Sequence, residues 1–336
     1  MKKYKVAIAG YGIVGKKRHE FINKNPHLEV VAISDKNDAQ LKDVKGNFNL
    51  FYDIEMMFKE EFEILFVCLI NNVAAETTIK GLKKGCHVFC EKPPGMSVEE
   101  IEEVISIEKQ NPSLKLKYGF NHRYHDSVEK ALSIVNSKEL GEIINLRGVY
   151  GKSMIVPSSG GWRAKLKLAG GGILLDQGIH MLDLMRLFSG EFNEIKSFIS
   201  NNYWKHEVED NAYALLKDKK GRISMLNSSA TQWHHKFSLE INLTEGYIIL
   251  DGIVTGSKSY GDEKIIIGKR DKSSEKGQLQ STQTKFLEDD SWRKEINHFV
   301  ESILSDKKIE FGSSLDALET MKLVFGIYKA DKEWQQ

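Results

Sequence analysis

The chain has 336 residues, of which 41% are hydrophobic and 28% are charged, and its formal net charge is +1. This length favours two domains of roughly 150 residues each. The near-neutral charge argues against a protein drawn by its overall field to nucleic acid or to an anionic membrane. The longest apolar run, Ile64 to Ile70, is far shorter than the roughly 20 residues of a membrane helix. We therefore expect a soluble globular protein with neither kind of partner.

The three cysteines, Cys68, Cys86 and Cys90, show no spacing typical of a metal site and fall on apolar stretches that read as buried strands. An odd number of such cysteines indicates reduced thiols that serve packing. The pattern predicts a cytoplasmic location and no bound metal.

A glycine-rich turn stands between a strand predicted from Lys5 to Ala9 and a helix predicted from Val14 to about Asn23. In Gly10-x-Gly12-x-x-Gly15 the first glycine permits the tight turn, the second lets the backbone approach a pyrophosphate, and the third lets the helix pack on the strand. The turn therefore predicts cofactor contacts at Gly10, Tyr11, Gly12, Ile13, Val14 and Gly15. A glycine-rich turn without a ligand is the alternative.

The second predicted strand, Leu28 to Asp35, ends in an acid twenty residues beyond Gly15. A carboxylate at this place meets the adenosine ribose diol and repels a 2′-phosphate, so Asp35 favours NAD over NADP. The neighbouring cation Lys36 could tolerate the phosphate, so NADP is not excluded. Asp35 as a helix N-cap is the alternative to a cofactor role.

Further strands and helices alternate through the first third of the chain. Strands are predicted at Glu63 to Leu69, His87 to Cys90 and Lys115 to Phe120, and helices at about Ala74 to Lys84 and Ser97 to Lys109. This alternation predicts a doubly wound parallel sheet. We assign residues 1–122 to an α/β Rossmann domain that binds NAD(P).

An acid, a base and two prolines follow the strand that ends at Cys90. Because proline cannot continue a sheet ladder, the chain must leave the sheet near Lys92. Glu91 and Lys92 would then lie at the carboxyl edge of the sheet, where open α/β folds bind ligands. Two solvated charges at the end of a strand are the alternative.

The pattern changes after residue 122, where several strands follow one another without intervening helices. These strands are Glu194 to Ser200, Asn211 to Lys217, Arg222 to Ser229, Phe237 to Leu243 and Tyr247 to Leu250. They predict an α+β domain over residues 123–336 with a large, mostly antiparallel open sheet. Lys269 to Gln283 is predicted as an exposed loop, and the terminal helix as one that can pack back on the first domain.

Three glycines, Gly170 to Gly172, precede a predicted helix and let the backbone come close to a ligand or to another element. On a regular helix Asp176, His180 and Asp183 would share one face, since they are spaced i, i+4 and i+7. An acid beside a histidine suits general acid/base chemistry. A purely structural pair is the alternative, and a metal site is disfavoured because only one histidine is present.

These motifs resemble those of the Gfo/Idh/MocA oxidoreductase family, which includes glucose–fructose oxidoreductase and inositol dehydrogenase. The matching residues are Gly10-x-Gly12-x-x-Gly15, Asp35, Val67-Cys68 with Asn71, Cys90-Glu91-Lys92-Pro93, Gly119 to Tyr124, and Gly170-Gly171-Gly172 with Asp176 and His180. Leu69-Ile70 stands where the family often has Thr-Pro, and Ala74 where it often has histidine. The resemblance extends over nearly the whole chain.

The resemblance implies an NAD(P)-dependent dehydrogenase or reductase that acts on a secondary alcohol of a sugar, a cyclitol or a sugar derivative, including a nucleotide-linked one. It implies Lys92, Asp176 and His180 as catalytic residues, Asn71, Glu91 and Lys92 as cofactor contacts, and a homodimer or homotetramer formed through the C-terminal sheet. Candidate substrate contacts are Arg123, Trp162 and Arg163. Two alternatives stay open: an NAD-dependent glycoside hydrolase that oxidises its substrate transiently, and a non-catalytic NAD-binding sensor or regulator.

Overall fold

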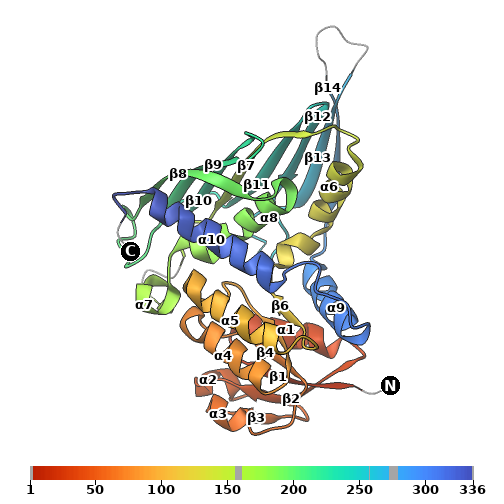
Figure 1. The fold of residues 1–336 in the computed structure, drawn as a ribbon, viewed down its shortest axis with the longest axis vertical. Coiled ribbons are helices and arrows are strands. Elements are labelled where there is room, and N and C mark those ends of the chain that lie inside the picture. Colours follow the sequence, from red (N-terminus) through yellow and green to blue (C-terminus); the bar gives the residue numbers. More distant parts are fainter. Residues whose placement is uncertain (1–2, 156–160, 257, 272–278, 335–336) are drawn as a thin grey trace. The chain divides into compact units, whose positions relative to one another are not determined.

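The computed structural model describes residues 3–155, 161–256, 258–271 and 279–334 (Figure 1). The chain forms two compact units. Unit 1 consists of Met1–Asn121 with Trp292–Leu318, and unit 2 of His122–Ser291 with Glu319–Gln336. Neither unit is one continuous stretch of sequence, and the boundary near the C-terminus falls inside helix α10 (Ser314–Ala330).

Unit 1 contains a six-stranded sheet, sheet A, in which all neighbouring strands are parallel. Its strands are β1 (Tyr4–Ala9), β2 (Leu28–Ser34), β3 (Asn49–Phe51), β4 (Ile64–Val67), β5 (His87–Cys90) and β6 (Leu116–Tyr118), in the order β3-β2-β1-β4-β5-β6. Its helices are α1 (Ile13–Asn23), α2 (Asp38–Leu41), α3 (Ile54–Met57), α4 (Asn71–Lys83), α5 (Val98–Gln110) and α9 (Ser291–Leu304). The predicted doubly wound parallel sheet is confirmed.

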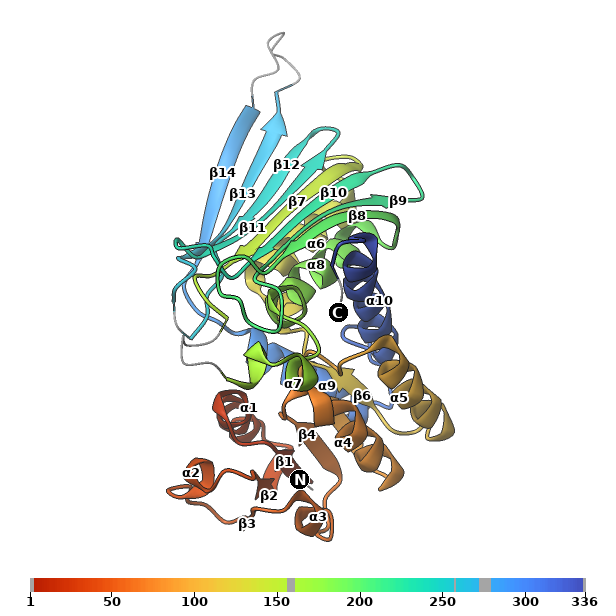
Figure 2. The same cartoon turned by 90° about the vertical axis from the view of Figure 1, so that its left-hand side faces the viewer.

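Unit 2 contains an eight-stranded sheet, sheet B, in the order β14-β13-β12-β11-β7-β10-β9-β8 (Figure 2). Its strands are β7 (Ile143–Gly151), β8 (Phe192–Ser200), β9 (Asn211–Asp218), β10 (Ile223–Ser229), β11 (Lys236–Leu243), β12 (Gly246–Asp251), β13 (Glu263–Arg270) and β14 (Leu279–Phe286). The strands β7 and β10 pair in parallel, and the other neighbours pair antiparallel. The predicted large, mostly antiparallel sheet is therefore confirmed.

The remaining elements of unit 2 are helical. They are η1 (Asn121–Tyr124, which begins one residue before the unit), α6 (Asp126–Ser137), η2 (Trp162–Ala164), α7 (Leu166–Ala169), η3 (Leu174–Gly178) and α8 (Ile179–Ser189). None of the helices in the described part of the chain is long and apolar enough to cross a membrane.

The prediction of an exposed loop from Lys269 to Gln283 was wrong at both ends. Strand β13 continues to Arg270, and β14 begins at Leu279 and pairs with it in antiparallel register. Because β14 is an edge strand, it can carry many polar side chains. A prediction based on hydrophobic pattern therefore misses it. Residues 272–278 of the predicted loop lie outside the described residues.

The two faces of sheet B differ. Helix α8 packs on one face, where a Cβ added to Gly148 of β7 would meet Met181 and Met185. The same face of β8 carries α10, because the Ser197 hydroxyl donates to the carbonyl oxygen of Ile327 at 2.7 Å. Phe198 of β8 and Tyr213 of β9 are cross-strand partners, and these two neighbouring apolar side chains are open to solvent.

A buried arginine ties helix α9 to sheet A. Arg18 of α1 is fully buried, and it donates to Glu91 at 2.6 Å and to Glu295 of α9 at 2.7 Å. Its guanidinium carbon also lies 4.3 Å from the ring centre of Phe89 and 4.2 Å from that of Trp292. Arg18 therefore joins three elements that are far apart in the sequence, and it belongs to the interior rather than to a solvated basic face.

We expect Arg18→Met to destabilise the protein by about 3–5 kcal/mol, because it leaves two buried carboxylates without their cation. Urea denaturation followed by circular dichroism measures this loss. Lys24→Met at the end of the same helix is the matched control, since Lys24 is exposed and its pair with Glu20 contributes only about 0.3–0.5 kcal/mol. Equal stability of Arg18→Met and Lys24→Met would contradict the assigned role.

Candidate active site

The glycine-rich turn of unit 1 has the geometry that a dinucleotide requires. Gly10 has φ +91°, and a Cβ there would lie 2.4 Å from the carbonyl oxygen of Cys68. A Cβ at Gly15 would lie 2.0 Å from the oxygen of Gly10, so both positions exclude any side chain. A Cβ at Gly12 would meet nothing within 4 Å. Gly10 and Gly15 therefore serve packing, whereas Gly12 faces open space that a pyrophosphate can occupy.

The start of helix α1 is also open. Gly12 is its N-cap, so no side chain caps the first N–H groups, and the first turn carries no acid. Ile13 beside it is 90% exposed. Free N–H groups at a helix N-terminus attract phosphate. The residues of the turn thus fit a dinucleotide cofactor.

Asp35 lies directly after β2 and is linked to the same turn. Its Oδ2 accepts the backbone N–H of Tyr11 at 2.7 Å, and its Oδ1 accepts that of Asn37 at 2.8 Å. The N-cap of α2 is Asn37, not Asp35. Lys36 is exposed beside it. The Asp35 carboxylate is therefore held next to the turn, which is the position that a contact with the adenosine ribose needs.

The other cofactor candidates follow the adjacent strands β4 and β5. Asn71 is buried and is the first residue of α4, and Glu91 is buried in its pair with Arg18. Lys92 is half-buried, and the Lys92–Pro93 peptide bond is cis. Because β1, β4 and β5 are parallel neighbours, these residues and the glycine-rich turn share the carboxyl edge of sheet A.

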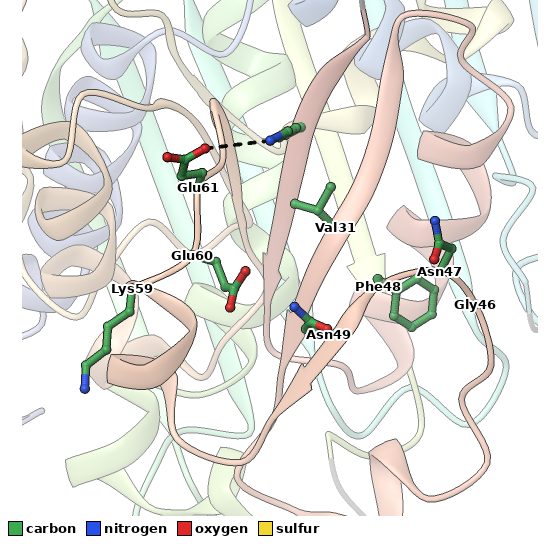
Figure 3. A pocket seen from close by; sticks show the side chains of 9 residues that line it. Val31, Gly46, Asn47, Phe48, Asn49, Lys59, Glu60 and Glu61 are labelled. Atoms are coloured by element: carbon green, nitrogen blue, oxygen red, sulfur yellow. Dashed lines mark ion pairs between the residues drawn. The ribbon is translucent and has the colours of Figure 1, made fainter.

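A surface groove of about 570 Å³ in unit 1 lies at the opposite edge of sheet A (Figure 3). It is lined by Lys5 at the start of β1, by residues 46–49 that lead into β3, by Val31 of β2, and by residues 59–61 that precede β4. Lys5 and Glu61 form an exposed ion pair of 3.8 Å there. None of the predicted site residues lines this groove.

In unit 2 a buried glutamate organises the three glycines. The Glu209 carboxylate accepts the backbone N–H groups of Gly172 at 2.7 Å and Leu174 at 2.9 Å, and the hydroxyl of Tyr328 at 2.7 Å. A Cβ at Gly172 would lie 2.1 Å from the carbonyl oxygen of Glu209, and one at Gly171 would lie 2.5 Å from the Tyr328 oxygen. Gly171 and Gly172 therefore leave room for Tyr328 and Glu209 to pack against the backbone.

The prediction of one regular helix through Asp176, His180 and Asp183 was wrong. Asp176 lies on η3, which is a π-helical turn, and His180 and Asp183 lie on α8, which follows it. A π turn bonds i to i+5, so the spacing of a regular α-helix does not apply across the junction. Asp183 is fully buried and pairs with Arg123, whereas Asp176 is bonded to other residues.

Asp176 is bonded to two cations. Its Oδ1 accepts from Nε of Arg163 at 3.1 Å, and its Oδ2 lies 3.4 Å from Nζ of Lys152. The guanidinium of Arg163 is also 4.3 Å from the ring centre of Trp162, which is half-buried. The structure thus brings together Asp176, Arg163 and Trp162, and it adds Lys152 from the end of β7.

His180 is buried against a second histidine. The rings of His180 and His122 are stacked, with centres 3.8 Å apart and planes at 15°. The His122 Nε2 and the Tyr150 hydroxyl are 3.1 Å apart. Burial raises the pKa of Tyr150 well above its usual range, so this hydroxyl stays protonated. No pattern in the sequence predicted that His122 would stack on His180, although His122 lies in the Gly119 to Tyr124 stretch that resembles the family.

Arg123 has a different environment from the other substrate candidates. Its Nε and a terminal nitrogen donate to Asp183 at 2.7 and 2.6 Å, and both side chains are buried. A bidentate buried pair of this kind favours a structural role for Arg123. Among the described residues, no group of three histidine, cysteine, aspartate or glutamate side chains could hold a metal ion.

Two family models match most of the chain. Residues 4–120 match an oxidoreductase family with an NAD-binding Rossmann fold, and residues 128–249 match the GFO/IDH/MocA C-terminal domain. The chain belongs to the Gfo/Idh/MocA oxidoreductase family. As a member of this family it is an NAD(P)-dependent oxidoreductase, and the resemblance inferred from its motifs is confirmed.

Named relatives of this Gfo/Idh/MocA protein act on sugars and cyclitols. It is 31% identical to D-glucoside 3-dehydrogenase of Escherichia coli K12, over 67% of this chain and 70% of that one. It is 24% identical to myo-inositol 2-dehydrogenase of Thermotoga maritima, over 74% and 75%. Among solved structures, levoglucosan dehydrogenase in complex with NADH has a TM-score of 0.87 at 18% identity and covers 99% of this chain and 98% of that one. This likeness shows a shared fold.

Burial raises the pKa of the Glu209 carboxyl to about 7. The folded protein therefore holds a proton at pH 5–7 that the unfolded chain has lost, so Glu209 makes the free energy of unfolding fall as the pH rises through this range. We expect this loss to be on the order of 2 kcal/mol larger in the wild type than in Glu209→Gln, whose side chain does not titrate. Urea denaturation at pH 5 and pH 7.5 compares the two. Parallel pH dependences would contradict the raised pKa.

Proposed function

We propose that this protein is a dehydrogenase that transfers hydride from a secondary alcohol of a sugar, a cyclitol or a sugar derivative to NAD. The proposal is carried by one observation: the chain has both the Glu91-Lys92-Pro93 motif and the three glycines followed by Asp176 and His180. Lys92 lies at the carboxyl edge of sheet A, and Asp176 and His180 lie on consecutive helical turns of unit 2. The names of the relatives, a D-glucoside 3-dehydrogenase and a myo-inositol 2-dehydrogenase, support a polyhydroxylated substrate.

The residues that would hold the cofactor are those that fit it in unit 1. The turn from Gly10 to Gly15 and the first N–H groups of α1 would hold the pyrophosphate, and Asp35 the adenosine ribose. Asn71, Glu91 and Lys92 would complete the contacts at the same sheet edge. NAD is favoured by the Asp35 carboxylate, and the exposed Lys36 leaves NADP open. When bound, this cofactor supplies the acceptor for the hydride.

The protein's own residues would move the proton. We propose that a ring nitrogen of His180 removes the proton of the substrate hydroxyl and that Lys92 Nζ donates a hydrogen bond to the same oxygen. Asp176 would orient His180 or the substrate. In the structure, Lys152 and Arg163 neutralise the Asp176 carboxylate, and a substrate hydroxyl would have to compete with these cations for it.

We also propose that the protein is a homodimer or homotetramer formed through the open face of sheet B, and that it works in the cytoplasm. The first proposal is supported by an apolar patch that Phe198, Tyr213 and Leu215 form on neighbouring strands. Their exposed fractions are 79%, 52% and 52%. The three free thiols Cys68, Cys86 and Cys90 support the second, because reduced cysteines are typical of that compartment.

We expect Lys92→Met to bind NAD nearly as tightly as the wild type and to lose about 10²–10³-fold in kcat, which is the range lost when one hydrogen-bond donor to the reacting oxygen is removed. Calorimetric titration with NAD and steady-state assays of NADH formation measure the two effects. Lys83→Met is the control, because Lys83 is an exposed residue of helix α4. Full activity of Lys92→Met would refute the catalytic assignment.

The same assays on the wild type separate the proposed reaction from its alternatives. Inositols, free sugars, glycosides and nucleotide sugars are each offered with NAD and with NADP. Net formation of the reduced cofactor supports a dehydrogenase. Cleavage of a glycoside without net reduction would indicate a hydrolase, and binding of NAD without any turnover would indicate a sensor.

We expect light scattering of the wild type to give a dimer or a tetramer. The double variant Tyr213→Lys/Leu215→Lys should give a smaller particle, because two buried lysines in an apolar interface lack partners. Leu315→Lys is the control, since Leu315 is 62% exposed and lies outside sheet B. A monomeric wild type would contradict the proposed assembly.

A further inference from the structure

Three large aromatic side chains gather at one end of sheet B, where the loops between strands meet. Tyr203 and Trp204 lie between β8 and β9, and Trp233 lies between β10 and β11. The Tyr203 ring centre is 5.0 Å from that of Trp204 and 5.5 Å from that of Trp233, with planes at 85° and 82°. We call these three residues the aromatic platform. Its outer members are largely exposed, Trp233 by 62% and Tyr203 by 57%.

The structure holds the platform in place. The buried Asp210 carboxylate accepts the backbone N–H groups of Tyr203 at 2.8 Å and Trp204 at 3.0 Å through one oxygen. The indole N–H of Trp204 donates to the carbonyl oxygen of Ala230 at 2.7 Å. The loop that carries Tyr203 is thus ordered before any ligand arrives, and binding to a preformed surface costs less conformational entropy than binding to a mobile one.

The platform is continuous with the surroundings of Asp176. Trp204 packs against a small apolar cluster that includes Ala164 and Ile173. Ala164 is the neighbour of Arg163, which is bonded to the Asp176 carboxylate. On the side of Trp233, the backbone N–H of Gln232 donates to the carbonyl oxygen of Lys152 at 3.0 Å. Lys152 is the second cation on Asp176, so each exposed ring is linked to the proposed substrate site by a few packed residues.

The chemistry of the platform favours a ring with an apolar face. Tyr203 and Trp233 stand nearly perpendicular, so a ring that lies on one of them meets the other with its edge. Sugar and aryl rings have an apolar face that can cover an aromatic side chain, and Tyr and Trp offer such a face at low entropy cost. Exposed aromatic rings beside a polar site are typical of a binding surface rather than of an inert one.

We propose that Tyr203 and Trp233 bind a second ring of the substrate, a sugar or aryl group attached to the ring that is oxidised. The protein would then act on glycosides in preference to free monosaccharides. This inference rests on the proposed function for the oxidised ring, but the binding of the second ring does not depend on turnover.

Steady-state kinetics with phenyl glucoside and with free glucose tests the inference. We expect Trp233→Ala and Tyr203→Ala to raise KM for phenyl glucoside about 3- to 10-fold, which is the scale of one aromatic stacking contact, with kcat nearly unchanged. KM for glucose should not change, and Trp233→Phe should restore most of the loss. Leu287→Ala is the control, because Leu287 is equally apolar and 79% exposed.

Calorimetric titration with phenyl glucoside separates the two proposals. If the wild type binds this glucoside and Trp233→Ala binds it 3- to 10-fold more weakly, the second-ring site stands even when no sugar is oxidised, and only the proposed function fails. Equal changes for glucoside and glucose, no change for either, or a change in particle size without a change in selectivity would overturn the inference. The last outcome would make the platform a contact between copies of the chain.

Discussion

Close approach of the backbone, permitted only by glycine, places the candidate residues in both units. In unit 1 a Cβ at Gly15 would lie 2.0 Å from the oxygen of Gly10, so helix α1 can start where it does only because Gly15 has no side chain. In unit 2 a Cβ at Gly172 would lie 2.1 Å from the carbonyl oxygen of Glu209. The first approach exposes the N-terminus of α1, and the second sets the start of the turn that carries Asp176.

Behind each motif lies a buried ion pair or a buried carboxylate. Arg18 binds Glu91, the residue before Lys92, and also Glu295 of helix α9. Glu209 holds the turn before Asp176 through two backbone N–H groups, and Arg123 holds Asp183 three residues after His180. Buried charges are expensive unless they are paired and hydrogen-bonded. These networks therefore tolerate little displacement, so they hold the segments that carry the motifs in fixed positions.

The surroundings of Asp176 and His180 suggest how substrate recognition is divided within unit 2. Near His180 the chain places the stacked ring of His122, which lies within hydrogen-bond distance of the protonated phenol of Tyr150. Near Asp176 it places two cations and, one layer further, exposed aromatic rings. Polar groups that fix one ring beside aromatic faces that cover another would together select a substrate longer than one sugar.

The sequence by itself determined the two kinds of sheet, the dinucleotide turn and the family, because these depend on local patterns. Strand and helix periodicity, the spacing of Gly10, Gly12 and Gly15, and the residues around Lys92 and His180 are each readable within a short window. It also determined that Asp35 follows β2, although only the structure shows its bond to the N–H of Tyr11.

Tertiary structure decided what depends on residues far apart in the chain. Arg18 and Glu295 are separated by 277 positions, and no local pattern distinguishes a buried arginine from an exposed one. Strand β14 is polar because it is an edge strand, and the turn at Asp176 is π-helical where the spacing predicted a regular helix. The stack of His122 on His180 and the meeting of Tyr203 with Trp233 likewise arise only when distant segments pack together. Local sequence determines the helices and strands, whereas buried ion pairs and contacts between aromatic rings determine the geometry of the site.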